Sequence, residues 1–179
     1  ALAAEAAIQR AANARPRGPA RAAALTALLT GAAPDPARAA ALLGLPANGL
    51  YRVAFASSEV DASILHRALS GLGALHEANP VDALRTAMVE LRPDAAEASV
   101  GQNRSGHAPS RRQSAERRMA LPQGWIALSG VTRGAVALPD ATNEARFVAS
   151  LLAAELLPPG VERFDALADV GAYRLLYRF

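Results

Sequence analysis

The residues best suited to chemistry in this sequence form a cluster of arginines. It consists of Arg111, Arg112, Arg117 and Arg118, with Glu116 as the one acid among them. Guanidinium groups bind phosphate and carboxylate oxygens through paired hydrogen bonds. Nucleic-acid sites normally add aromatic side chains for base stacking, and none is interleaved here. We therefore expect a solvated loop that offers a weak anion-binding or partner-binding patch.

Other side chains that could do chemistry lack the partners that the chemistry requires. The candidates are the histidines His66, His76 and His107, the serines Ser57, Ser58 and Ser129, and the glycine pair Gly71 and Gly73. The histidines do not have metal-ligand spacing, and the serines lack a Gly-x-Ser-x-Gly turn. The glycine pair follows a predicted helix instead of a strand, which indicates a helix stop and not a dinucleotide loop. We expect no catalytic, cofactor-binding or metal-binding residues.

Composition excludes several classes of protein. The 179 residues suit one domain with a helical appendage. All 19 basic residues are arginine, and against 16 acidic residues they give a net charge of only +3, which is not the signature of a nucleic-acid-binding domain. Cysteine is absent, so disulfides and thiolate metal sites are excluded.

The apolar runs of the sequence bear on where the protein is located, and its ends bear on whether it is part of a longer protein. No apolar run approaches the ~20 residues of a membrane span, and no basic-then-apolar leader opens the chain. We expect a soluble, cytoplasmic protein without a membrane partner. The chain begins with Ala1 and stops inside an amphipathic pattern at Phe179. This indicates a piece of a longer protein.

Helical segments are predicted ahead of the first strand. Strong helix formers fill residues 1–14, and a proline-containing stretch then interrupts them. Helical spacing resumes at 21–30, and Asp35 is placed to cap a helix over 37–43. We therefore expect an N-terminal helical arm or linker over residues 1–45.

Alternating strand and helix patterns predict an α+β domain over residues 46–164. Within it, residues 93–122 are rich in Ser, Gly, Asn, Gln and Arg, which predicts a mobile insert. Trp125 is expected to anchor a strand in the core. The expected elements are, in order, a central strand 50–56, a core helix 61–71 capped by Asp61, hairpin strands 74–78 and 84–91, a strand 124–130, a helix 140–156 capped by Asp140, a strand 161–164, and a C-terminal connector helix over 165–179 capped by Asp165.

Several short motifs of low specificity, taken in this order, resemble those of one protein family. They are the segments Arg21–Gly31, Asp35–Leu45, Asp140–Leu152 with Glu144-Ala145-Arg146, Val161–Leu167 and Tyr173–Leu176. Together they look like the central GGDEF-like domain of PucR/CdaR-type bacterial transcriptional regulators, over roughly residues 20 to 179. The resemblance implies a relative of nucleotidyl cyclases that keeps a ferredoxin-like antiparallel sheet with packing helices.

The resemblance also implies what catalysis would require. A cyclase hairpin needs two glycines, so that backbone can approach the nucleotide, and acidic side chains that hold the metal ion. Here Pro80 and Val81 do not supply the open backbone, and Asp82 is a lone acid where a pair is needed. Glu59 and Asp61 could be a remnant of a metal site, although a helix cap explains Asp61 better. A pseudo-enzyme is expected.

Three functions remain open. The family implies a non-catalytic regulatory domain, forming a homodimer, that relays a signal from an unknown small-molecule effector to a helix-turn-helix DNA-binding domain outside this chain. The alternative is a degenerate nucleotide- or small-ligand-binding domain related to diguanylate cyclases. The third is a scaffold that binds a partner through the arginine-rich loop. None of them gives this chain a DNA-binding surface of its own.

Overall fold

The computed structural model describes residues 18–92, 124–157 and 163–165, together with Val170, Tyr173, Leu176 and Tyr177. The helix expected over 1–14, the insert expected over 93–122 and most of the terminal helix expected after Asp165 lie outside these residues. So does the cluster of Arg111, Arg112, Arg117 and Arg118.

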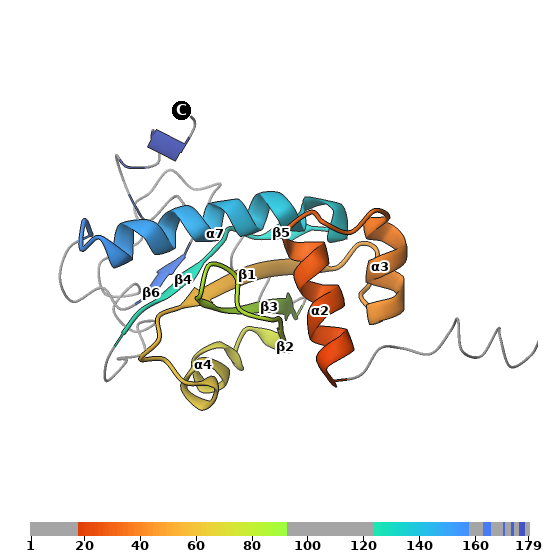
Figure 1. Ribbon diagram of the computed structural model, residues 1–179, viewed down its shortest axis with the longest axis horizontal. Helices are drawn as coiled ribbons and strands as arrows, with labels where there is room; N and C mark the ends of the chain where they lie inside the picture. The colour runs from red at the N-terminus through yellow and green to blue at the C-terminus, as the bar shows by residue number, and fades with distance from the viewer. Residues whose placement is uncertain are drawn as a thin grey trace, which may run out of the picture.

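One sheet organises the described part of the chain (Figure 1). Its strands are β1 (Leu50–Ala56), β2 (Gly73–Glu77), β3 (Arg85–Leu91), β4 (Ile126–Leu128), β5 (Thr132–Arg133) and β6 (Arg163–Asp165). The order across the sheet is β2-β3-β1-β4-β6, and β5 also pairs with β1. All pairings are antiparallel except that of β4 with β6, which is parallel. The predicted hairpin, the central position of β1 and the α+β class are confirmed.

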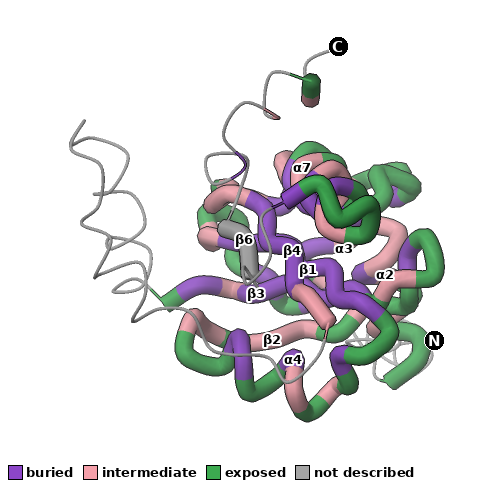
Figure 2. Tube along the Cα trace, turned by 90° about the vertical axis from the view of Figure 1, so that its left-hand side faces the viewer, coloured by how far each residue is buried: buried purple, intermediate pink, exposed green. Residues whose placement is uncertain are grey.

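Helices cover both faces of the sheet. They are α2 (Gly18–Leu29), α3 (Pro36–Leu43), α4 (Ala62–Leu69) and α7 (Leu138–Ala153), with a short 3-10 turn η1 (Ala135–Ala137) before α7. In Figure 1, α7 crosses one face with α2 and α3 beside it, and α4 lies under the other. Figure 2 shows buried residues concentrated in β1, β3 and β4, between α7 and α4. No helix among the residues described is long and apolar enough to cross a membrane.

The two covered faces explain why β1 is apolar at every position except Arg52. Side chains alternate between the faces of a strand, and directly paired residues share a face. Val53 pairs with Met88, and both belong to the core cluster under α2, α3 and α7. Ala54 pairs with Ala87, and both belong to the cluster over α4, to which Leu65 contributes. A strand buried on both faces loses the polar alternation of a half-exposed one.

Local capping sets two helix starts as the sequence predicts. The Asp35 carboxylate accepts a hydrogen bond from the backbone N–H of Arg38 at 2.9 Å, and Pro36 opens α3. The Asp61 carboxylate accepts one from the backbone N–H of Ile64 at 2.8 Å. Each bond satisfies an amide of the first turn that has no partner inside its helix.

Several expected helix boundaries are wrong, among them the end of α7, which is Ala153 instead of residue 156. Three others have a local reason. Helix α2 begins at Gly18 instead of residue 21, because proline is tolerated in a first turn, where its missing N–H is not needed. Helix α7 begins at Leu138, so Asp140 lies in its first turn and is not the cap. Helix α4 ends at Leu69 and not at residue 71. The last boundary moves because Gly73 already belongs to β2.

The last two strands also differ from the prediction. Asp165, expected as a helix cap, lies in β6 and pairs with Leu128. The strand expected over 124–130 is shortened to β4, and the strand β5 that follows it at Thr132–Arg133 was not expected. Between the pairs Ala54–Leu128 and Tyr51–Thr132, two residues of β1 face three residues, 129–131, of the other strand. This extra residue makes a β-bulge.

Candidate functional site at the β2–β3 hairpin

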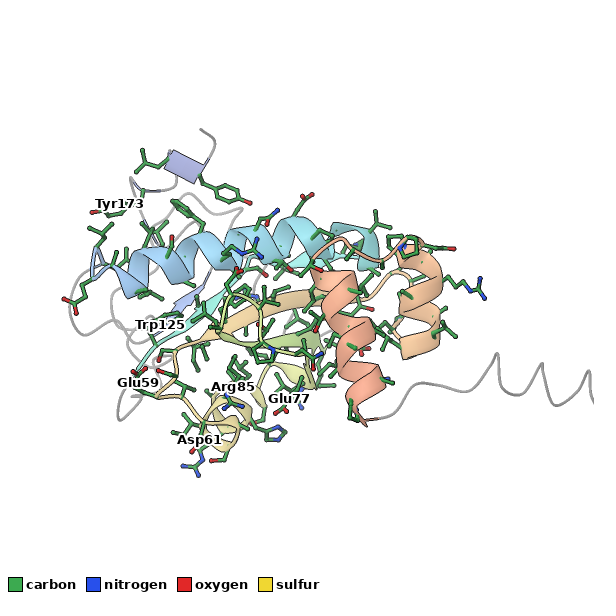
Figure 3. The ribbon with its side chains drawn as sticks, viewed as in Figure 1. Glu59, Asp61, Glu77, Arg85, Trp125 and Tyr173 are labelled. Atoms are coloured by element: carbon green, nitrogen blue, oxygen red, sulfur yellow. The ribbon has the colours of Figure 1, made fainter. Side chains whose placement is uncertain are left out.

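The loop after β1 and the tip of the β2–β3 hairpin lie at the same end of the sheet. Ala56, the last residue of β1, pairs with Arg85, the first residue of β3. Figure 3 shows Glu59, Asp61, Arg85 and Trp125 toward this end. The lone acid of the hairpin and the two acids after β1, singled out from the sequence, are therefore brought to one end of the fold.

The hairpin turns at Asp82 and Ala83. Val81 and Leu84 exchange backbone hydrogen bonds of 3.1 and 2.9 Å across these two residues. Asp82 has φ +52° and Ala83 has φ +62°, the left-handed values of a type I′ turn. The turn thus lies within the connection expected between strands 74–78 and 84–91, and it does not fall on Pro80 and Val81. Val81 instead packs into the core, with 7% of its surface exposed.

Ala83 carries a side chain in a conformation that favours glycine, and relieving this conflict should stabilise the fold. We expect Ala83→Gly to raise the free energy of unfolding by about 0.5 to 1 kcal/mol, because the relief of left-handed strain exceeds the added entropy of the unfolded chain. Chemical denaturation of the two proteins measures this difference. Ala23→Gly, at an exposed position within α2, is the control and should lower stability by about 1 kcal/mol. A loss of stability in both variants would show that the left-handed conformation of Ala83 is not strained.

An ion pair joins the hairpin tip to α7. The Arg146 Nε donates to Asp82 Oδ2 at 2.6 Å, and the same guanidinium donates to Asn143 Oδ1 at 2.8 Å. The side chains of Arg146 and Asp82 are 41% and 58% exposed, so solvent screens the pair and its contribution to stability is below about 1 kcal/mol. Its main effect is to occupy one carboxylate oxygen of Asp82, which faces the Arg146 guanidinium.

The acids after β1 are held by their own loop. Asp61 accepts hydrogen bonds from the Ile64 backbone N–H and from Ser63 Oγ at 2.7 Å, and these bonds hold the pKa of Asp61 below its usual value. Hydrogen bonding, first of all to Ser57, likewise lowers the pKa of Glu59. Groups with lowered pKa values stabilise the fold above their ordinary pKa, and this contribution is lost as pH falls through the folded-state value. The prediction that Asp61 is a helix cap is confirmed.

Polar contacts bind this loop to its neighbours. Ser57 is buried, and its Oγ accepts a hydrogen bond from the Trp125 backbone N–H at 3.2 Å. The Trp125 side chain packs against the core under α7, as a strand anchor should. Arg85 Nε donates to the Val60 carbonyl at 3.1 Å, which joins the base of the hairpin to the loop. Ser57 therefore has a structural role at this end of the sheet.

Helix α2 is tied to the same hairpin. Thr26 Oγ1 accepts a hydrogen bond from the Asn79 backbone N–H at 2.9 Å. Arg21 Nη2 lies 3.2 Å from His76 Nδ1, and His76 Nε2 lies 3.2 Å from Glu90 Oε2. His66, by contrast, is exposed on α4. The hairpin thus has polar contacts with α2 through His76 of β2 and through Asn79 in the connection after it, and with α7 through its tip.

Sequence reasoning missed these contacts because they join distant positions. Arg21 and His76 are separated by 55 residues, and Asp82 and Arg146 by 64. Hydrophobic periodicity places Arg21 and Arg146 on helices but does not say which strand each helix crosses. The one sequence feature that could have indicated the contact with Arg146 is the isolated Asp82, because an acid at the tip of a hairpin attracts a cation from the element packed against it.

Within the described ranges, no group of three or more His, Asp or Glu side chains could hold a metal ion. Comparison with protein-family models, with curated proteins and with solved structures gives no match to this chain.

Proposed function

We propose that this chain is a non-catalytic regulatory and dimerisation module of the PucR/CdaR type. In this proposal it acts in the cytoplasm and relays an effector signal to a helix-turn-helix DNA-binding domain outside the chain. The observation that carries the proposal is the β2–β3 hairpin, which is joined by side-chain contacts to the N-terminal helix α2 and to α7. A module of this kind has to connect its two ends, and the hairpin provides a physical path between them.

The strand order supports a ferredoxin-like, GGDEF-like sheet. A βαββαβ chain of this type has four antiparallel strands in which the first lies between the third and the fourth, and the second lies at the edge. The order β2-β3-β1-β4, with antiparallel neighbours throughout, agrees with that description. Helix α4 occupies the first crossover, between β1 and β2. Strand β6, which follows α7 in the chain, extends the sheet beyond this unit by pairing in parallel with β4.

The chemistry at the hairpin supports a non-catalytic role. Phosphoryl transfer with a hard metal ion needs clustered carboxylates that are free to bind it. Asp82 is bonded to Arg146, and Asp61 is bonded to the first turn of α4. Ala83 places a methyl group at a turn where a nucleotide would have to approach the backbone. Asp82 and Asp61 thus each have a protein partner where a metal ion would have to bind.

The contacts of the hairpin also suggest how a signal could pass. A shift of α2 along the sheet would act on β2 through Arg21 and Thr26. The tip would carry that shift to Arg146 on α7. Contiguous polar contacts between packed elements can couple two sites when the elements have two arrangements. Self-association would then bring the DNA-binding domains of two chains to paired half-sites.

Thermal unfolding at two protein concentrations, with and without GTP and Mg²⁺, tests this proposal against a degenerate nucleotide-binding domain. A dimer predicts a Tm that rises between about 2 µM and about 200 µM protein, because association stabilises the folded state by mass action. Nucleotide is expected to leave Tm unchanged. A nucleotide at about 100 times its Kd would instead add about 2.7 kcal/mol, a clear rise in Tm.

The outcomes separate the two functions. A Tm that is independent of protein concentration counts against dimerisation. Stabilisation by GTP with Mg²⁺ favours the nucleotide-binding alternative, and the variant Asp82→Asn then locates the ligand. Asp140→Asn is its matched control, because Asp140 is an exposed acid in the first turn of α7. Stabilisation lost in the first variant and kept in the second would place the nucleotide at the hairpin.

A further inference from the structure

A chain of three side chains joins the N-terminal half of α2 to the sheet. Arg21 Nη2 faces His76 Nδ1 at 3.2 Å, and His76 Nε2 faces Glu90 Oε2 at 3.2 Å. The side chains of His76 and Glu90 are 17% and 28% exposed, so they are half-buried beneath the helix. Arg21 also donates from Nη1 to the Leu43 carbonyl at 2.8 Å. One guanidinium therefore links α2 to the end of α3 and to β2.

The chemistry of these groups fixes the state of the histidine. Arginine has donors and no acceptor, so His76 Nδ1 must present its lone pair to Arg21. The ring proton then lies on Nε2 and is donated to the Glu90 carboxylate. Both contacts are hydrogen bonds when His76 is neutral in the Nε2–H tautomer. The result is an ordered series of cation, neutral ring and anion.

We propose that His76 is a pH-sensitive latch, which holds the first turns of α2 on the sheet while it is neutral and releases them when it is protonated. A proton on Nδ1 removes the lone pair that Arg21 uses. It also places two cations in contact. Glu90 keeps its bond to Nε2–H and attracts the imidazolium more strongly, so the ring stays on the sheet while the guanidinium leaves it.

The groups around His76 determine how far its protonation can disturb the structure. Among the residues that the structure describes, the charged groups in contact with it are Arg21 from α2 and Glu90 from β3. Tyr51 of β1 is the cross-strand neighbour of Glu90, and its hydroxyl is engaged by the Pro46 carbonyl at 2.6 Å. From α3 comes the uncharged Leu43 carbonyl, and α4 lies on the opposite face of the sheet.

Later turns of α2 are held independently of the histidine. Leu25, Leu28 and Leu29 are buried in the core, and Thr26 is bonded to Asn79. Release is therefore confined to the start of the helix. The latch is a property of the fold and does not depend on the regulatory role proposed above.

Hydrogen exchange of the full chain tests the latch. We expect the protection of amides in the first half of α2 to fall about fivefold to tenfold from about pH 7.5 to about pH 5.5, relative to α7 and after correction for intrinsic rates. His76→Asn should abolish this fall, because the Asn carbonyl can accept from Arg21 and does not titrate. His66→Asn is the matched control at an exposed histidine and should retain the fall.

Two further measurements guard the conclusion. If His76→Asn does not fold, Arg21→Gln replaces it, because a neutral donor removes the repulsion and should weaken the pH dependence. Ring ¹⁵N spectra at neutral pH should show the Nε2–H tautomer of His76. An Nδ1–H tautomer, pH-independent protection of α2 in the native chain, or an unchanged fall in His76→Asn would each overturn the proposal.

Discussion

Gly73→Ala is expected to lower the free energy of unfolding by about 3 kcal/mol, the upper range for overpacking a folded protein. A Cβ at Gly73 would overlap the carbonyl oxygen of Glu90 and approach the Glu90 carbonyl carbon to 2.8 Å and Leu91 Cα to 3.0 Å. All three atoms belong to the backbone of β3, so no side chain can rotate away. The strand β2 must move, and its pairing with β3 is disturbed along the hairpin.

Gly71→Ala is the matched control, two residues away on the same connection. A Cβ at Gly71 meets nothing within 4 Å, and the residue is exposed in the turn after α4. We expect its stability to stay within about 0.5 kcal/mol of the native chain, as for ordinary surface substitutions. Urea denaturation of the three proteins makes the comparison. Equal losses in the two variants would show that close backbone approach at Gly73 is not the cause.

The contrast between these glycines shows where reading the sequence succeeds and where it stops. The pair was expected to end a helix, and Gly71 does lie just beyond α4. Gly73 is instead the first residue of β2, where the space it leaves is filled by the backbone of β3. Its neighbour across the sheet, Leu91, is 18 positions later in the chain. A local pattern does not contain the distance between two strands.

Elements with local causes were predicted well. The strand over 50–56 has the bounds expected, and the helix after Asp35 begins one residue before the expected 37–43, because an apolar run and a capping residue act on their immediate neighbours. Helix α7 was placed too late, since Asp140 is an equally good first-turn acid and cap by sequence alone. What decides between these positions is the packing of Leu138, which is fully buried.

The candidate site shows the same division. That Asp82 stands alone at a hairpin is visible in the sequence, and so is the lack of two glycines there. That the turn falls on Asp82 and Ala83 depends on which pair of residues closes the ladder, and the register of β2 and β3 decides it. The partner of Asp82 depends on a third element, α7. A contact is harder to predict from the sequence when more separate elements must be positioned to make it.

Ser129 lacks the partners of a nucleophile in the sequence, and the structure shows that its hydroxyl completes the hydrogen bonding of β1. It lies in the bulge between β4 and β5, fully buried. Its Oγ accepts a hydrogen bond from the Val53 backbone N–H at 2.9 Å and donates to the Gly130 carbonyl at 2.8 Å. Its own N–H donates to the Val53 carbonyl at 2.9 Å. The hydroxyl therefore replaces a backbone acceptor that the bulge removes from the central strand.

Ser129→Ala should accordingly lower the free energy of unfolding by about 2 kcal/mol, because it leaves the Val53 N–H buried without an acceptor. Ser150→Ala is the control. Its exposed Oγ donates to the Phe147 carbonyl within α7, and alanine is the better helix former, so its stability should change by less than about 0.5 kcal/mol. Denaturation measures the difference, and exchange of the Val53 amide localises it. Unchanged protection of that amide in Ser129→Ala would mean that the hydroxyl does not complete the ladder. Accelerated exchange at Val53 with slow exchange kept at Ala54 would assign the loss to this one acceptor.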